Sequence, residues 1–101
     1  MAMTIIVATN VKPRVSGFLG SVMLEVAPTV YLSAQMSRSV RQRVWETLTE
    51  WHAHEPQGSI VLIWRTAVVP TGIEVLYLGI PRRDLAELDG LLVVRRALNC
   101  L

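Results

Sequence analysis

Residues 60–78, IVLIWRTAVVPTGIEVLYL, decide the architecture, because they form two apolar segments separated by turn residues. The run Ile60–Trp64 has the length of a strand and is apolar throughout, which is typical of an interior strand. Val69-Pro70-Thr71-Gly72 is a turn sequence, and Ile73–Leu78 forms a second strand before Gly79-Ile80-Pro81 ends it. The sequence therefore predicts a β-hairpin in this region.

Two helical patterns precede the hairpin. Pro13 suits the first turn of a helix, and the pattern that follows runs to Val26 before Pro28 stops it. Its apolar stripe comprises Val15, Phe18, Leu19, Val22, Met23 and Val26. Ser37 is the candidate N-cap of a second helix, which Gly58 closes. One face of this second helix carries Val40, Val44, Trp45, Leu48 and Trp51, and the other carries Arg41, Arg43, Glu46 and Glu50.

Further strands complete the pattern. Met3–Ala8 is rich in β-branched residues, and Thr29–Leu32 is a short strand that either continues through Ser33–Gln35 or folds back there. Leu91–Val94 is the last predicted strand, and it pairs with a sheet edge of the same chain or of another protomer. This order predicts an α+β fold: a ferredoxin-like sandwich of two helices on one antiparallel sheet, with an extra C-terminal strand.

Length and composition bound the class of protein. The 101 residues are enough for a single domain, residues 1–101, with the C-terminal strand as an extension. A hydrophobic content of 51% and a mean hydropathy of +0.40 indicate apolar surface that meets a partner, so we expect an oligomer. Because no apolar run approaches about 18 residues, and residues 1–10 do not resemble a signal peptide, we expect a cytoplasmic protein without a membrane segment. Cys100 is the only cysteine, which excludes a disulfide framework.

Two groups of residues invite a metal-site interpretation. His52 and His54 are two positions apart on a helix and therefore face different directions, whereas helical ligands are spaced by three or four; a solvated helix end explains them as well. Asp84, Glu87 and Asp89 supply carboxylates that suit a hard cation, although such a run more often caps a short helical turn.

Two common catalytic and nucleotide-binding patterns are missing from the sequence. Gly17 and Gly20 lie inside the first predicted helix, so they do not form a phosphate-binding loop between a strand and a helix. No nucleophile-elbow pattern is present, and both histidines share one helix end. Catalysis by a Ser-His-Asp triad is therefore not expected.

The arginines are the strongest pointer to a ligand. Nine of the ten basic residues are arginine, whose planar guanidinium pairs with phosphate through two parallel hydrogen bonds. Basic residues at a helix start oppose the helix dipole unless an anion binds there, and a phosphate backbone is such an anion. The candidate phosphate-binding residues are Arg14 in the first helix, Arg38, Arg41 and Arg43 in the second, and Arg82 and Arg83 after the hairpin.

The arginine content alone does not establish a phosphate ligand. Scattered solvated charges, or a GC-rich genome that favours arginine codons, would produce the same composition, and the net charge is only +2. Trp45, Trp51 and Trp64 fall on apolar faces and are predicted to be core residues that do not alternate with the arginines. We therefore expect contact with a duplex backbone rather than stacking of single-stranded bases.

Several short motifs occur in the same order as in a known family. They are Asn10–Arg14 followed by Gly17 and Leu19, Leu24–Val26 before Val30-Tyr31, Val44–Glu46, Thr71-Gly72 with Glu74, Gly79 with Arg82-Arg83, and Leu88–Leu91. Together they resemble CRISPR-associated protein 2 of type I-E systems. The resemblance spans residues 3–94, nearly the whole chain.

This resemblance implies a homodimer that assembles with CRISPR-associated protein 1, the integrase that inserts captured DNA as new spacers in prokaryotic antiviral defence. The small protein bridges two integrase dimers and supports the prespacer duplex, while the integrase performs the chemistry. Arg14, Arg41 and the pair Arg82-Arg83 match family positions that touch the DNA backbone. Arg38 and Arg43 are nearby additions without a clear match.

Many relatives in this family are magnesium-dependent nucleases that use an acidic residue at the end of the first strand. This sequence has Ala8-Thr9-Asn10 there, so we expect no catalytic residue, metal or cofactor. The alternative is a magnesium-dependent endonuclease acting on RNA or DNA, or a toxin-like ribonuclease on the same fold. The carboxylates available to an endonuclease are Asp84, Glu87, Asp89 and Glu25.

Overall fold

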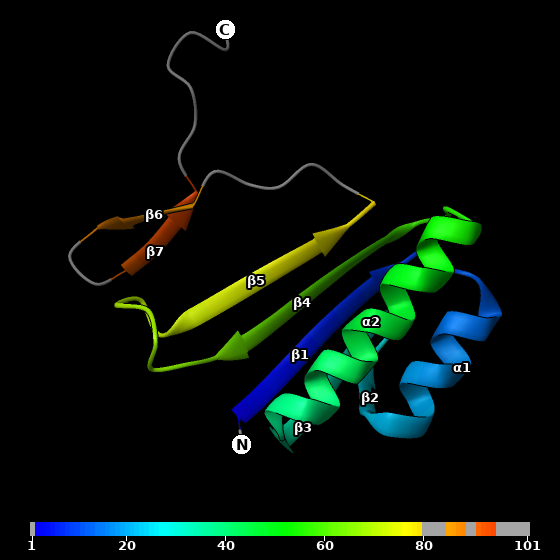
Figure 1. Ribbon diagram of the computed structural model, residues 1–101, viewed down its shortest axis with the longest axis horizontal. Coiled ribbons are helices and arrows are strands. Elements are labelled where there is room, and N and C mark those ends of the chain that lie inside the picture. The colour runs from blue at the N-terminus through cyan, green and yellow to red at the C-terminus, as the bar shows by residue number, and fades with distance from the viewer. Residues whose placement is uncertain (1, 80–84, 89–90, 95–101) are drawn as a thin grey trace, which may run out of the picture.

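The computed structural model describes residues 2–79, 85–88 and 91–94, the last two ranges by their backbone alone. Seven strands and two helices follow one another along these residues (Figure 1). They are β1 (Ala2–Thr9), α1 (Pro13–Val22), β2 (Leu24–Ala27), β3 (Val30–Met36), α2 (Arg38–His54), β4 (Ser59–Arg65), β5 (Ile73–Leu78), β6 (Leu85–Leu88) and β7 (Leu91–Val94).

Five strands form one antiparallel sheet in the order β2-β3-β1-β4-β5, and both helices lie on the same face of it (Figure 1). The predicted α+β fold with two helices on one antiparallel sheet is therefore confirmed. The ferredoxin-like unit runs from β1 to β4, and β5 extends its sheet by pairing with β4.

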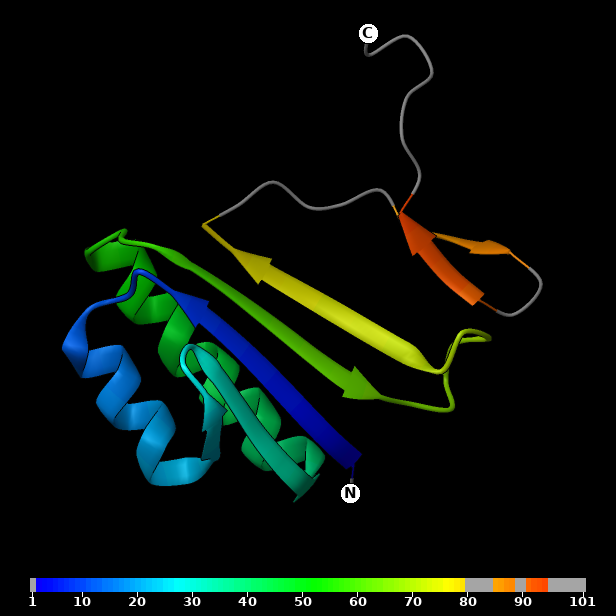
Figure 2. The ribbon, with the colours of Figure 1, turned by 180° about the vertical axis from the view of Figure 1, so that it is seen from behind.

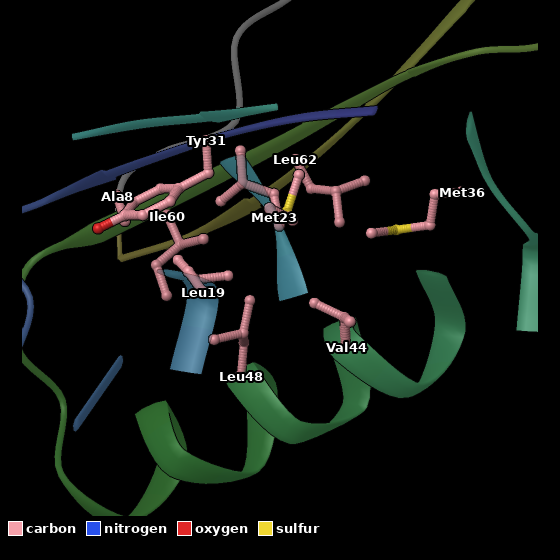
Figure 3. Packing of buried hydrophobic residues seen from close by; sticks show 10 residues of the cluster. Ala8, Leu19, Met23, Tyr31, Met36, Val44, Leu48, Ile60 and Leu62 are labelled. Carbon is pink, nitrogen blue, oxygen red and sulfur yellow. The ribbon is translucent and has the colours of Figure 1, made fainter. Parts of the chain in front are cut away.

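The core lies between the helices and this sheet. Thr4, Ile6 and Ala8 alternate along β1 with residues that are less buried, so one face of the strand points at the helices. In Figure 3, Leu19 of α1 and Leu48 of α2 point toward the sheet residues around Ile60. The buried hydrophobic residues are Ile6, Ala8, Leu19, Met23, Tyr31, Met36, Val44, Leu48, Ile60 and Leu62.

The first helix is shorter than its apolar pattern predicts. It ends at Val22, where the N–H of Met23 donates to the carbonyl of Leu19 over 2.8 Å, and β2 follows instead of another helical turn. The prediction of a helix up to Val26 was therefore wrong. Thr29, with a φ of 71°, reverses the chain after Pro28, so that β2 can pair with β3 and satisfy its backbone groups there.

The boundaries of the later elements are also set by local contacts. β3 is one continuous strand, which resolves the alternative left open at Ser33–Gln35. Ser37 caps α2 as predicted, because its Oγ accepts a hydrogen bond from the Val40 N–H over 3.3 Å. The helix ends at His54, before Gly58, which instead forms a tight turn with a φ of 73°.

The last predicted strand is present as β7. It pairs antiparallel with β6, from Leu85 opposite Val94 to Leu88 opposite Leu91, in a separate two-stranded sheet. The helical turn expected around residues 84–89 was wrong, since a strand occupies Leu85–Leu88. No helix in the described part of the chain is both long and apolar enough to cross a membrane.

Candidate nucleic-acid interface

The first basic site lies at the start of α1, where Arg14 is exposed in the first turn. Its guanidinium carbon lies 4.0 Å from the centroid of the Trp51 ring, near the end of α2. Trp51 in turn packs edge-on against Phe18 of α1, with the ring centroids 5.3 Å apart and the planes at 71°. The indole is therefore held between the two helices and carries a cation on its face.

Lys12 and Glu55 connect the same two helices. Lys12 is the N-cap residue of α1 and pairs with the carboxylate of Glu55, the C-cap residue of α2. The hydrogen bond from Lys12, followed by the positive charge of Lys12, lowers the pKa of Glu55. This pair ties the start of α1, and with it Arg14, to the end of α2.

The second basic site lies on the first half of α2. Arg38 and Arg43 are exposed, whereas Arg41 is partly buried, with its guanidinium carbon 4.4 Å from the centroid of the Trp64 ring in β4. Burial, and then the charge of Arg38, lower the pKa of Arg41. A groove of about 570 Å³ runs along this site between α2 and the strands. Its lining includes Arg38, Arg41, Trp45 and Trp64, together with the carboxylates Glu46 and Glu74.

The tryptophans correct one prediction. Trp51 and Trp64 were expected to be core residues apart from the arginines, yet each has a guanidinium stacked on its ring. Trp45 and Trp64 also pack partly buried against the core, so burial and arginine contact coexist at Trp64. No spacing in the sequence signals these pairs, because Arg14 and Trp51 come from different helices and Arg41 and Trp64 from a helix and a strand.

The candidate arginines of residues 2–79 do not form one cluster. Arg41 and Trp51 are separated by about 15 Å along the axis of α2, so the Arg14 site and the Arg41 site lie toward opposite ends of that helix. Within residues 2–79, the one ion pair is that between Lys12 and Glu55, and neither helix has an acidic residue in its first turn. No carboxylate of residues 2–79 therefore pairs with Arg14, Arg38, Arg41 or Arg43.

Arg82 and Arg83 lie outside the described residues. The last described residue before them, Gly79, lies beside Gly58 and His52. A β-carbon on Gly79 would be 2.2 Å from the Gly58 carbonyl oxygen and 3.1 Å from Nε2 of His52. The chain therefore leaves β5 near the end of α2, which is also the end where Arg14 stacks on Trp51.

The carboxylates and histidines considered as metal ligands are only partly within the described residues. Glu25 is exposed on β2, and Glu87 belongs to β6, whereas Asp84 and Asp89 lie outside the described residues. His52 and His54 occupy the last turn of α2, as predicted. In the part of the chain that could be searched, no three His, Cys, Asp or Glu side chains gather closely enough to hold a metal ion.

Comparison with known protein families gives a match over most of the chain. Residues 3–93 match the model of a family described as CRISPR-associated protein (Cas_Cas2CT1978). The matched range begins in β1 and extends into β7, so it includes both helices and every strand of the five-stranded sheet. The match therefore concerns the whole fold and both arginine sites, and not a single short motif.

Proposed function

The chain belongs to the family of CRISPR-associated Cas2 proteins (Cas_Cas2CT1978), and on this basis we propose that it is a structural DNA-binding adaptor of spacer acquisition. In this proposal it is the type I-E form, works in the cytoplasm, bridges two dimers of the CRISPR-associated integrase and supports the prespacer duplex. The integrase supplies the catalytic residues. The order of motifs from Asn10 to Leu91 supports the type I-E assignment.

The observation that carries the proposal is the stacking of Arg14 and Arg41 on indole rings without an acidic partner in the described part of the chain. A stacked guanidinium directs its N–H donors outward in the plane of the group, where a phosphate can accept them. Contacts of this kind fix the position of a duplex without reading its sequence. That property suits a protein that must accept prespacers of any sequence.

The uncovered face of the sheet supports a homodimer. Met3, Ile5 and Val7 of β1 alternate with the buried residues and therefore point away from the helices, as do Val61 and Ile63 of β4. Figure 2 shows this side of the five strands, with the helices behind them. Such a continuous apolar surface favours association with a second copy, which would double the number of arginine sites.

The end of β1 argues against the endonuclease alternative. β1 ends at Thr9, and Asn10 follows with a φ of 55°, so no carboxylate stands at the position that nucleases of this family use. A magnesium-dependent reaction would need other oxygen ligands. Glu25 on the edge strand β2 is exposed and distant in sequence from the C-terminal carboxylates.

The deciding experiment measures duplex DNA binding at low and high salt, with magnesium, in the presence and absence of the cognate integrase, followed by a gel for cleavage products. We expect intact DNA, binding that depends on the integrase, and affinity that falls steeply with salt. Arg14→Ala and Arg41→Ala should each weaken binding and reduce the slope of log K against log salt by about one unit.

Two results would contradict the proposal. If the slope of log K against log salt stays the same in both arginine variants, neither arginine contacts a phosphate. Cleavage by this chain alone, abolished by chelation and by Glu25→Gln or Asp89→Asn, would support the endonuclease instead. Cleavage that survives those carboxylate substitutions would indicate a contaminating nuclease and would leave the binding data to decide.

A further inference from the structure

We propose that Trp51 and Trp64 are positioning residues for DNA binding, each holding one arginine in the orientation in which it meets a phosphate. The inference rests on the proposed function, because it concerns the same duplex contacts. It adds a division among the arginines: Arg14 and Arg41 are preorganised by an indole, whereas Arg38 and Arg43 are exposed and have no stacked ring among the described residues.

The geometry at Trp51 supports a fixed platform. The ring contacts Phe18 edge-on, and Arg14 stacks on it at 4.0 Å, so the cation, the indole and the phenyl ring form one connected stack. The pair Lys12–Glu55 fastens the same helix ends together. Since the backbones that carry Arg14 and Trp51 belong to two packed helices, the stacked position is one that the packing of α1 on α2 makes available to the Arg14 side chain.

The geometry at Trp64 also supports an arginine held on an indole ring, here between a helix and a strand. Trp64 belongs to β4, on the face that packs against the core, and Arg41 reaches it from α2 at 4.4 Å. Arg38 lies close enough for its charge to act on Arg41, yet residues 2–79 contain no ion pair to either arginine. Glu46 and Glu74 line the same groove, but neither forms an ion pair with Arg38 or Arg41. The two neighbouring guanidiniums can therefore donate to a phosphate, and the duplex backbone supplies a row of phosphates.

Preorganisation has a measurable consequence. An arginine loses rotamer entropy when it binds a phosphate, and a guanidinium already stacked on a ring has lost part of that entropy in the free protein. Stacking leaves the in-plane donors available. We therefore expect Arg14→Ala and Arg41→Ala to weaken duplex binding more than Arg38→Ala and Arg43→Ala do.

The test is a double-mutant cycle on duplex affinity at low salt, with and without the integrase. Trp51→Leu should weaken binding about two- to fivefold, the size of an exposed cation–π interaction, and Arg14→Ala should weaken it at least as much. The double variant should bind no more weakly than Arg14→Ala alone, because the indole acts only through the arginine. The pair Arg41 and Trp64 should give the same pattern.

Conservative variants separate positioning from general folding effects. Trp51→Phe keeps an aromatic face and should retain more affinity than Trp51→Leu, while Arg14→Lys keeps the charge but not the planar stack and should bind more weakly than the wild type. Val44→Ala is the control, since Val44 is a buried core residue of α2 that lines neither arginine site. It should lower thermal stability without coupling to Arg14.

The outcomes distinguish this inference from the proposed function. If Arg14→Ala and Arg41→Ala leave binding unchanged, the proposed function itself fails. If they weaken binding but the tryptophan variants are additive with them, or Trp51→Phe behaves like Trp51→Leu, the positioning role alone is wrong. Should Trp51→Leu fail to fold, the effect of Arg14→Lys on duplex affinity is compared in the wild-type and Trp51→Phe backgrounds. This comparison decides the positioning role, because neither change removes a core side chain.

Discussion

Gly58 is the residue at which three backbone segments meet. A β-carbon at this position would lie 2.3 Å from the carbonyl oxygens of both Thr9 and Asn10, and Gly79 closes on Gly58 from the other side. The φ of 73° adds a conformation that other residues rarely adopt. This contact joins the end of β1, the start of β4 and the end of β5, next to the Arg14 site.

Replacing Gly58 therefore tests how much that junction contributes to the stability of the fold. We expect Gly58→Ala to reduce the free energy of unfolding by at least about 2 kcal/mol, because backbone atoms cannot move aside as a flexible side chain would. Urea unfolding followed by circular dichroism measures the loss. Gly17→Ala is the matched control: nothing lies within 4 Å of its new β-carbon, and alanine should stabilise α1 slightly. Equal losses of stability in the two variants would contradict the crowding around Gly58.

Tyr31 makes the stability of the protein sensitive to alkaline pH. Burial in the core, and then the charge of Glu25, raise the pKa of its phenol. The folded state therefore holds this proton more tightly than the unfolded state, so the contribution is present below the unfolded value near 10 and is lost as pH rises through the folded pKa.

Tyr31→Phe removes the ionisable phenol, and with it this contribution to the pH dependence of stability. The difference in unfolding free energy between the wild type and the variant should be constant from pH 7 to 9. Above pH 10 it should shift in favour of the variant, because the phenol then ionises in the unfolded chain while the buried phenol keeps its proton. Chemical denaturation across this range measures it. A constant difference at all pH values would show that the phenol ionises equally easily in both states.

At the scale of elements, the N-cap of α2 fixes where the Arg38, Arg41 and Arg43 segment begins. The Oγ of Ser37 accepts the Val40 N–H, and this is the side-chain cap that α1 lacks. We expect Ser37→Ala to cost about 1 kcal/mol of stability. Gln42→Ala, at an exposed position inside the same helix, should cost almost nothing, because alanine is a better helix former there. Thermal unfolding compares the two, and similar losses would show that the cap is not the cause.

At the scale of the whole molecule, the open face of the five-stranded sheet, opposite the helices, is the surface through which we expect two copies to associate. Ile63 lies on β4 between Leu62 and Trp64, which face the helices, so its side chain belongs to the open face. We expect Ile63→Asp to convert a dimer into a monomer, since an unpaired carboxylate would be buried in the interface. Analytical ultracentrifugation measures the mass. Val68→Asp, on a loop residue that is 89% exposed, is the control and should remain dimeric.

A monomer formed by Ile63→Asp would also bear on DNA binding. It would halve the number of arginine sites per particle, so the salt dependence of duplex binding should become weaker together with the change in mass. If the wild type is already monomeric at the concentrations used for DNA binding, the proposed dimer interface on the open face is wrong.

The sequence by itself determined the class of fold and the position of each basic residue along it. Periodicity and turn residues predicted β1, β3, β4, β5, β7 and both helices. These elements are set by the local spacing of apolar residues and by the glycines and prolines that end them. The sequence also located the arginines at the helix starts. The family assignment rests on this order of motifs and on the family match over residues 3–93.

Only the tertiary structure decided what depends on contacts between distant residues. β2 forms because an edge strand can pair with β3, a hydrogen-bonding opportunity that outweighs a helical apolar pattern ending at Val26. Arg14 meets Trp51 and Arg41 meets Trp64 because α1 packs on α2 and α2 packs on β4. Periodicity reports which face of an element is apolar, but not which side chain of another element will cover it, and the proposed platforms depend on that second fact.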